Sequence, residues 1–112
     1  MSKVFEVLIN GEPVGSMSQM EIDMPWFYAR FSPNASFAKY AALFGNLDQA
    51  YDEKRYDDVN RLNNEINKLR ILIPDENKQV LFSTDQNDKP IQRIRSVRIL
   101  GNKIMWRPAP GN

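Results

Sequence analysis

The sequence contains no cysteine and no histidine. Without cysteine there is no disulfide framework, no thiol nucleophile and no thiolate metal site. Without histidine there is no Ser-His catalytic pair, no imidazole proton shuttle and no common zinc site. The glycines are isolated rather than clustered ahead of a helix, which excludes a phosphate-cradling loop. We therefore expect a protein that is not an enzyme and that uses no cofactor and no metal.

Long hydrophobic runs are also missing. The longest apolar stretches, such as residues 7–9 and 41–44, are far shorter than the roughly 20 residues that a bilayer span needs. No signal-peptide core precedes the first strand-like segment. With neither cysteines nor a leader, we expect a cytoplasmic protein.

What remains is an ordinary globular composition, 42% hydrophobic and 26% charged over 112 residues. A chain of this length buries one core, so residues 1–112 are expected to form a single domain. The charge is unevenly placed, because residues 1–88 carry nine Lys/Arg and fourteen Asp/Glu, whereas residues 89–112 carry six Lys/Arg and no acid. This segregation produces a local positive field, although solvation of a wet strand face is the simpler explanation.

Stretches rich in β-branched and aromatic residues predict strands at both ends of the chain. We expect them over residues 4–9, 14–22, 26–31, 79–83, 91–100 and 103–107. Asn10-Gly11 is a strong hairpin signal, either as a two-residue loop or as part of a longer loop that ends at Pro13, and the register of this hairpin stays open. Alternation in the third strand places Phe27, Ala29 and Phe31 on the buried face.

The last two strands are joined by the two-residue turn Gly101-Asn102, which fixes a register. The expected pairs are Leu100 with Lys103, Ile99 with Ile104, Arg98 with Met105, Val97 with Trp106 and Ser96 with Arg107. One face of this hairpin is then apolar and the other is polar. Upstream, Ile94 falls on the polar face, so we expect a bulge near Arg95-Ser96 that restores the pattern.

Two helices are predicted between these groups of strands. The first has an apolar stripe formed by Phe37, Tyr40, Ala41, Phe44 and Leu47. It is expected to begin at Ser32-Pro33, with Asn34 and Ser36 as alternative caps, and to end at Gly45-Asn46. The second covers about residues 57–69, residues 48–56 are a short helix or an extension of either neighbour, and residues 70–73 are a short apolar connection. The order β-β-β-α-α-β-β-β predicts an α+β fold, with an antiparallel sheet of about five or six strands and the helices packed on one face.

Acidic side chains offer two alternatives to a purely structural role. One group has the oxygen ligands that Mg²⁺ and Ca²⁺ prefer, but it lacks calcium-loop spacing and is explained by the helix dipole; its members are Asp48, Asp52, Glu53, Asp57 and Asp58. Asp23 precedes an aromatic block and is the one acid with the character that a carboxylate-dependent hydrolase requires. Turn formation is the simpler role for Asp23.

Binding is better supported than catalysis. Trp, Tyr and Arg are enriched at binding hot spots, and Trp26, Tyr28 and Arg30 lie opposite the expected core, unless helices cover that face or Trp26 closes the end of the core. Arg98, Lys103 and Arg107 form a second, basic surface on the last hairpin. We expect a non-catalytic protein that binds another protein, with nucleic-acid binding through the basic hairpin as the alternative. The partner and the oligomeric state stay open.

Part of the chain resembles small, uncharacterised bacterial proteins of similar size. The likeness covers roughly residues 4–47 and rests on residues 10–15, on Asp23-Met24-Pro25-Trp26, on residues 31–33 and on Phe37, Tyr40, Leu43 and Phe44. It implies a bacterial, cytoplasmic α+β protein and brings no known activity or site residues. Proteins of this kind include partners and inhibitors of other proteins, toxins among them, which is an analogy at the level of the fold.

Overall fold

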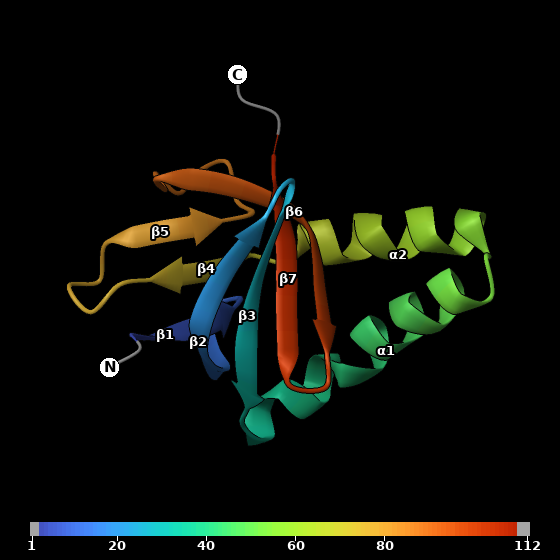
Figure 1. Cartoon of the computed structure of the whole chain (residues 1–112), viewed down its shortest axis with the longest axis horizontal. Helices are drawn as coiled ribbons and strands as arrows, with labels where there is room; N and C mark the ends of the chain where they lie inside the picture. The colour runs from blue at the N-terminus through green and yellow to red at the C-terminus, as the bar shows by residue number, and fades with distance from the viewer. Residues whose placement is uncertain (1–2, 110–112) are drawn as a thin grey trace.

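Seven strands dominate the computed structural model, which describes residues 3–109 (Figure 1). They are β1 (Val4–Ile9), β2 (Glu12–Asp23), β3 (Trp26–Pro33), β4 (Ile71–Pro74), β5 (Val80–Ser83), β6 (Gln92–Leu100) and β7 (Lys103–Pro108). They close into a barrel in the order β1-β2-β3-β7-β6-β5-β4, with β4 pairing back to β1. The predicted α+β class is confirmed.

The predicted antiparallel sheet of about five or six strands is wrong in two respects. Residues 71–74, expected as a connection, form β4, which pairs with β1 on one side and with β5 on the other. In addition, β5 and β6 run parallel, so the barrel is mixed. The order of elements is therefore β-β-β-α-α-β-β-β-β. β4 could not be predicted from the sequence, because this strand has only four residues and is mostly buried, so its residues do not alternate between apolar and polar.

The first hairpin adopts the shorter of its two expected loops. Ile9 pairs with Glu12, and the intervening Asn10 and Gly11 have φ angles of 53° and 83°. This positive-φ geometry is the one that an Asn-Gly pair accommodates best. Further along β2, a Cβ atom on Gly15 would lie 2.4 Å from the carbonyl oxygen of Ser32. Glycine at this position therefore lets β2 and β3 approach closely.

The last hairpin follows the predicted register near its turn. Leu100 with Lys103, Ile99 with Ile104 and Arg98 with Met105 are all observed. The expected bulge is also present: the register shifts between Arg95 and Arg98, Ser96 has a φ of 54°, and Ile94 is returned to the core. Because the register shifts between Arg95 and Arg98, the expected pair of Ser96 with Arg107 is wrong, and the expected pair of Val97 with Trp106 is not among the observed pairs. Arg95 is instead opposite Arg107, and Ile94 is opposite Pro108.

The first helix begins and ends later than predicted, whereas the second lies within one residue of its expected bounds. A short 3₁₀ turn, η1 (Ala35–Phe37), leads into α1 (Ala38–Asp52), which is followed by α2 (Tyr56–Lys68). The Asn34 side chain caps η1 by accepting a 2.8 Å hydrogen bond from the Ser36 amide, whereas Pro33 still belongs to β3. The first helix continues through Gly45-Asn46, because Leu47 and Ala50 extend its buried stripe.

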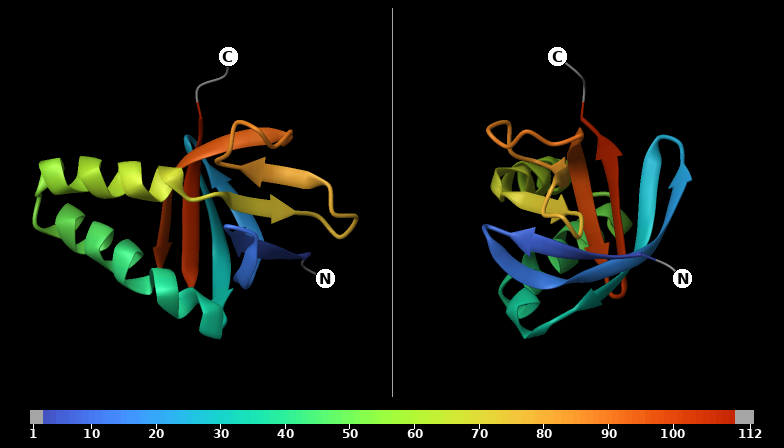
Figure 2. Two further views of the ribbon diagram at one scale, coloured as in Figure 1. Left: turned by 180° about the vertical axis from the view of Figure 1, so that it is seen from behind. Right: turned by 90° about the vertical axis from the view of Figure 1, so that its left-hand side faces the viewer.

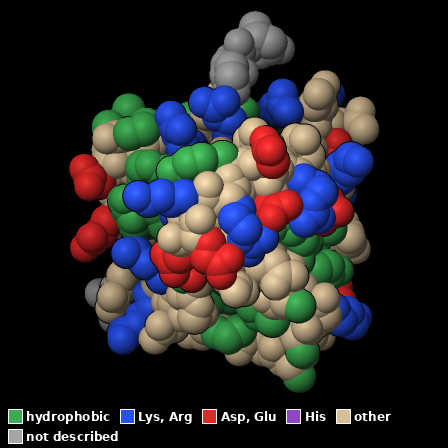
Figure 3. Space-filling model, turned by 90° about the vertical axis from the view of Figure 1, so that its right-hand side faces the viewer, with side chains coloured by type: hydrophobic (Ala, Val, Ile, Leu, Met, Phe, Trp, Pro, Cys, Tyr) green, Lys and Arg blue, Asp and Glu red, His purple; other side chains and the backbone are tan. Residues whose placement is uncertain are grey.

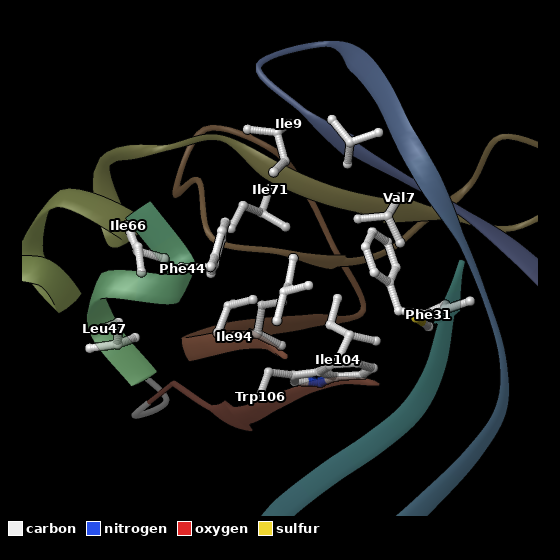
Figure 4. Close-up of a cluster of buried hydrophobic side chains, with 14 of the residues drawn as sticks. Val7, Ile9, Phe31, Phe44, Leu47, Ile66, Ile71, Ile94, Ile104 and Trp106 are labelled. Carbon is white, nitrogen blue, oxygen red and sulfur yellow. The ribbon is translucent and has the colours of Figure 1, made fainter. Parts of the chain in front are cut away.

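The two helices form a hairpin that projects from one side of the barrel (Figures 1 and 2). Its base packs against β6, and Phe44, Leu47 and Ile66 join the buried cluster that contains Ile94 and Trp106 (Figure 4). In the described part of the chain, neither helix is long and apolar enough to cross a membrane. Since the helices lie to the side, neither of them covers the outer surface of β3 and β7.

Candidate binding surface

The outward side of β3 and β7 joins two surfaces that the sequence presents separately. These strands are neighbours in the barrel, with Tyr28 opposite Met105 and Arg30 opposite Lys103. Alternation turns Phe27 and Trp106 inward and the other set outward, where Met105 is nevertheless buried. We call the outward residues that reach solvent the β3–β7 face; it consists of Trp26, Tyr28, Arg30, Lys103 and Arg107.

Each aromatic ring of the β3–β7 face lies beneath a cation from β7. The Lys103 ammonium nitrogen is 4.8 Å from the centre of the Tyr28 ring, and the Arg107 guanidinium carbon is 5.5 Å from the centre of the Trp26 ring. Both rings are half-buried. These distances are those of cation–π contacts, so the rings hold the two cations in defined positions above the barrel.

The cations of this face have no acidic partner. Within residues 3–109, no carboxylate lies within 4.0 Å of a charged nitrogen of Arg30, Lys103 or Arg107, since the ion pairs of the described chain all lie elsewhere. Arg95, opposite Arg107 on β6, is exposed and likewise unpaired in this part of the chain. The face is therefore positive over β7 and β6.

Arg98 lies apart from the β3–β7 face. Its side chain is 18% exposed, and one guanidinium nitrogen donates a 3.0 Å hydrogen bond to Asp48 of α1. The guanidinium carbon also lies 4.2 Å from the centre of the Tyr51 ring. Of the six predicted binding residues, five thus come together on one surface, while Arg98 connects β6 to the helical hairpin.

Three members of the acidic group of the two helices contact arginines. Asp48 contacts Arg98, while Glu53 and Asp58 both contact Arg55. Hydrogen bonds from Gln49 and Arg55 hold the pKa of Glu53 below its ordinary value. Among residues 3–109, no three acidic side chains converge into a metal-binding group. Pairing with arginine explains the placement of these three members, whereas Asp52 and Asp57 have no ion pair among the described residues.

Asp23 does not sit in the environment that a carboxylate hydrolase needs. It closes the β2–β3 hairpin opposite Trp26 and is exposed. A general acid at neutral pH needs an apolar cleft that disfavours its ionised form. The exposure of Asp23 gives no support to the hydrolase alternative.

A shallow hollow of about 330 Å³ lies beside the β3–β7 face. Its lining includes Gln19, Glu21, Tyr28, Arg30, Asn102 and Lys103. The pairing of β2 with β3 is interrupted between Ser18 and Glu21, where Gln19 has a φ of 55°. Reasoning from the sequence missed Gln19 and Asn102, because neither the bulge in β2 nor the pairing of β3 with β7 leaves a local signal.

The face is defined by geometry alone, and the resemblance to small bacterial proteins remains a prediction. No protein-family model, no curated protein and no solved structure matches the chain.

Proposed function

We propose that this chain is a non-catalytic binding protein that holds an acidic protein partner on its β3–β7 face. The observation that carries the proposal is the pairing of β3 with β7, which places Trp26 and Tyr28 beside Arg30, Lys103 and Arg107 on one uncovered surface. Tyr, Trp and Arg are the residues that dominate the energetics of protein interfaces. An inhibitor or immunity-type role with a one-to-one complex fits this surface.

The cations of the face are well placed to bind carboxylates. Arg30, Lys103 and Arg107 have no ion pair within the described residues to give up on binding, so a partner's acids add charge-assisted hydrogen bonds. The rings under Lys103 and Arg107 restrict their side chains before the partner arrives. Side chains that are already positioned lose less conformational entropy in the complex.

The helical hairpin is a weaker candidate, although it is also highly charged. Acidic and basic side chains are interspersed at its end of the molecule (Figure 3). Arg55 contacts Glu53 and Asp58, and Arg61 lies 3.6 Å from Asp58 and 3.9 Å from Glu65. A partner's acids would compete with these existing contacts. The unpaired cations therefore favour the barrel rather than the helices.

Single-stranded nucleic acid is the second candidate, because a row of unpaired cations also suits phosphates. Such binding normally uses open aromatic faces on which bases stack. Trp106 is completely buried, and the Trp26 and Tyr28 rings already carry cations of the protein itself. A base would have to displace Lys103 or Arg107 in order to stack. This is why we place a protein partner first.

A charge-matched pair of double variants tests the proposal. Lys103→Glu with Arg107→Glu reverses the face, and Lys54→Glu with Lys89→Glu makes the same net change at exposed sites far from it. Partners retained from a lysate of the native host at physiological salt are quantified by mass spectrometry, and the affinity of the retained protein is then titrated. We expect the face variant to weaken binding at least tenfold, which corresponds to about 1.4 kcal/mol.

The proposal is supported if the wild type and the control retain one protein in stoichiometric amount and the face variant does not. Absence of such a protein, or equal retention by the face variant, contradicts it. A labelled single-stranded oligonucleotide is titrated at two salt concentrations in parallel. Binding that falls with salt and is lost in the face variant would replace the protein partner with a nucleic acid.

A further inference from the structure

Within residues 3–109, the second half of β2 has an open strand edge. β1 accompanies β2 only as far as the pair Val4–Ser18, whereas β3 continues along the opposite edge to Asp23. Among the residues that the structure describes, residues 19–23 therefore have a strand neighbour on one side only, and all five are exposed. The right-hand view of Figure 2 shows the tip of the β2–β3 hairpin standing apart from the rest of the barrel.

Backbone groups on this edge are available for hydrogen bonding. In an antiparallel strand, every second residue directs its N–H and C=O groups away from its neighbour. Among residues 3–109, no backbone or side-chain hydrogen bond beyond the β2–β3 pairing reaches residues 19–23. Proteins usually protect such an edge with charged side chains, proline, a β-bulge or a covering element. Here the bulge at Gln19 and the acids Glu21 and Asp23 disfavour an acidic added strand, and no element of the described chain covers the edge.

The side chains of the open edge alternate between two chemistries. Met20 and Ile22 share one side of the strand, and they are 40% and 60% exposed. Glu21 and Asp23 share the other side, and neither has a basic partner within 4.0 Å among the described residues. A strand added at this edge could cover the exposed apolar side chains with one of its faces and pair with the acids through the other.

We propose that residues 20–23 accept an extended segment of a partner protein as an eighth strand, in which apolar residues alternate with lysine or arginine. The backbone of the partner segment would form hydrogen bonds with the open edge of β2, and these bonds supply affinity that does not depend on the sequence of the segment. Apolar side chains of the added strand cover Met20 and Ile22, and its cations face Glu21 and Asp23. This site goes beyond the β3–β7 face, because it uses different residues and takes a ligand of opposite charge.

Charge disfavours a second copy of the chain that pairs through Ile22 or Glu21. An antiparallel copy centred on Ile22 would place Glu21 opposite Asp23 of the other copy. A copy centred on Glu21 would place two glutamates opposite each other. Like charges directly across a strand pair are destabilising. The same acids would be repelled by an anionic membrane surface, which disfavours lipid as the occupant of this tip.

Two capped peptides of one composition provide the probe. One alternates lysine and valine over eight residues, and the other has four lysines followed by four valines. Hydrogen exchange of the full chain is measured with and without each peptide. We expect the edge-facing amides of residues 20–23 to exchange rapidly in the free protein. With the alternating peptide at saturation they should exchange at least tenfold more slowly, and with the block peptide they should not change.

Charge variants identify the site independently of folding effects. Glu21→Lys with Asp23→Lys should weaken the alternating peptide at least tenfold. Glu6→Lys with Glu76→Lys makes the same net change at exposed positions and should leave binding unchanged. Because Lys103 lines the same hollow as Glu21, Lys103→Glu with Arg107→Glu should not weaken the alternating peptide, whereas it should weaken an acidic partner of the β3–β7 face. Circular dichroism establishes that each variant is folded before it is titrated.

Three results would overturn the proposal. The first is protection of the edge amides in the free protein, which would mean that the edge is already covered. The second is equal binding of the two peptides, which would mean that charge alone is recognised. The third is protection that grows with protein concentration in the absence of peptide, which would make a second copy the occupant.

Discussion

The two faces of the β3–β7 strand pair are made by alternate residues of the same two segments, yet they differ in every physical respect. On the inner face, Phe27 stacks on Trp106 with ring centres 5.8 Å apart and planes within 2°, and Phe82 lies 5.2 Å from Trp106. On the outer face, each aromatic ring is half-buried beneath a cation. Strand alternation thus separates a packed inner face, which contains Trp106, from the proposed binding face, which contains Trp26.

Replacing each tryptophan in turn tests most directly whether the inner face contributes more to stability than the outer face. Trp106 is completely buried, so Trp106→Ala leaves a large cavity and should lower the free energy of unfolding by about 3–5 kcal/mol. Trp26→Ala removes a half-buried ring and one cation–π contact, and should cost about 1 kcal/mol. Urea unfolding followed by circular dichroism measures both, since the fluorescence of the variants is altered.

The relative size of the two losses decides the outcome. A loss in Trp26→Ala as large as that in Trp106→Ala would make the outer ring part of the core, and the β3–β7 face would no longer be free to bind a partner. A small loss in Trp106→Ala would instead show that the stacked rings contribute little to the barrel.

The sequence predicts what depends on neighbouring residues. Asn10-Gly11 and Gly101-Asn102 specify their turns through local backbone preferences, and the misplaced Ile94 reveals the bulge at Ser96. The outward set on β3 follows from alternation alone. Five of the six predicted binding residues consequently lie on one surface, although the sequence offers no reason to expect the two groups to meet.

Closure of the barrel depends on contacts between distant segments. β4 joins residues near position 72 to residues near position 8, and β7 pairs with β3 across the whole helical hairpin. The partner of Arg98 is 50 residues away in α1. Neither pairing partners nor such side-chain contacts have a local signature, because loop closure and packing select them. For this reason Arg98 is indistinguishable from its unpaired neighbours in the sequence alone.

Arg98 and Arg95 are both cations of β6, but in the described chain only Arg98 has an ion pair. Comparing them tests whether pairing contributes to stability. Arg98→Ala removes the hydrogen bond to Asp48 and the contact with Tyr51, and should lower the free energy of unfolding by about 1–2 kcal/mol. Arg95→Ala removes an exposed side chain and should change it by no more than about 0.5 kcal/mol. Equal effects in chemical unfolding would mean that pairing does not distinguish structural cations from binding cations here.

Low pH should reduce the stability of the protein through the ion pair between Arg70 and Asp88, which lies outside both faces of the β3–β7 pair. An Arg70 guanidinium nitrogen donates to Asp88 at 2.8 Å, and the Ser83 hydroxyl donates to the other carboxylate oxygen at 3.0 Å. The hydrogen bond from Arg70 holds the pKa of Asp88 below its ordinary value, against the opposing effect of burial. Together these contacts fasten the loop between β5 and β6 to the start of β4.

Because the pKa of Asp88 is lowered by folding, its contribution to stability is complete above the unfolded pKa of about 4 and is lost as the pH falls below that value. The loss should be about 1 kcal/mol, since the guanidinium of Arg70 is half-exposed and screened by solvent. Urea unfolding of the wild type and Asp88→Asn between pH 6 and pH 3 isolates it as a difference between the two curves. The free energies of unfolding of the two proteins should converge at low pH, because asparagine at position 88 has no carboxylate that can be protonated. Parallel curves would assign the acid sensitivity to other carboxylates, such as Glu12, which is paired with Lys39.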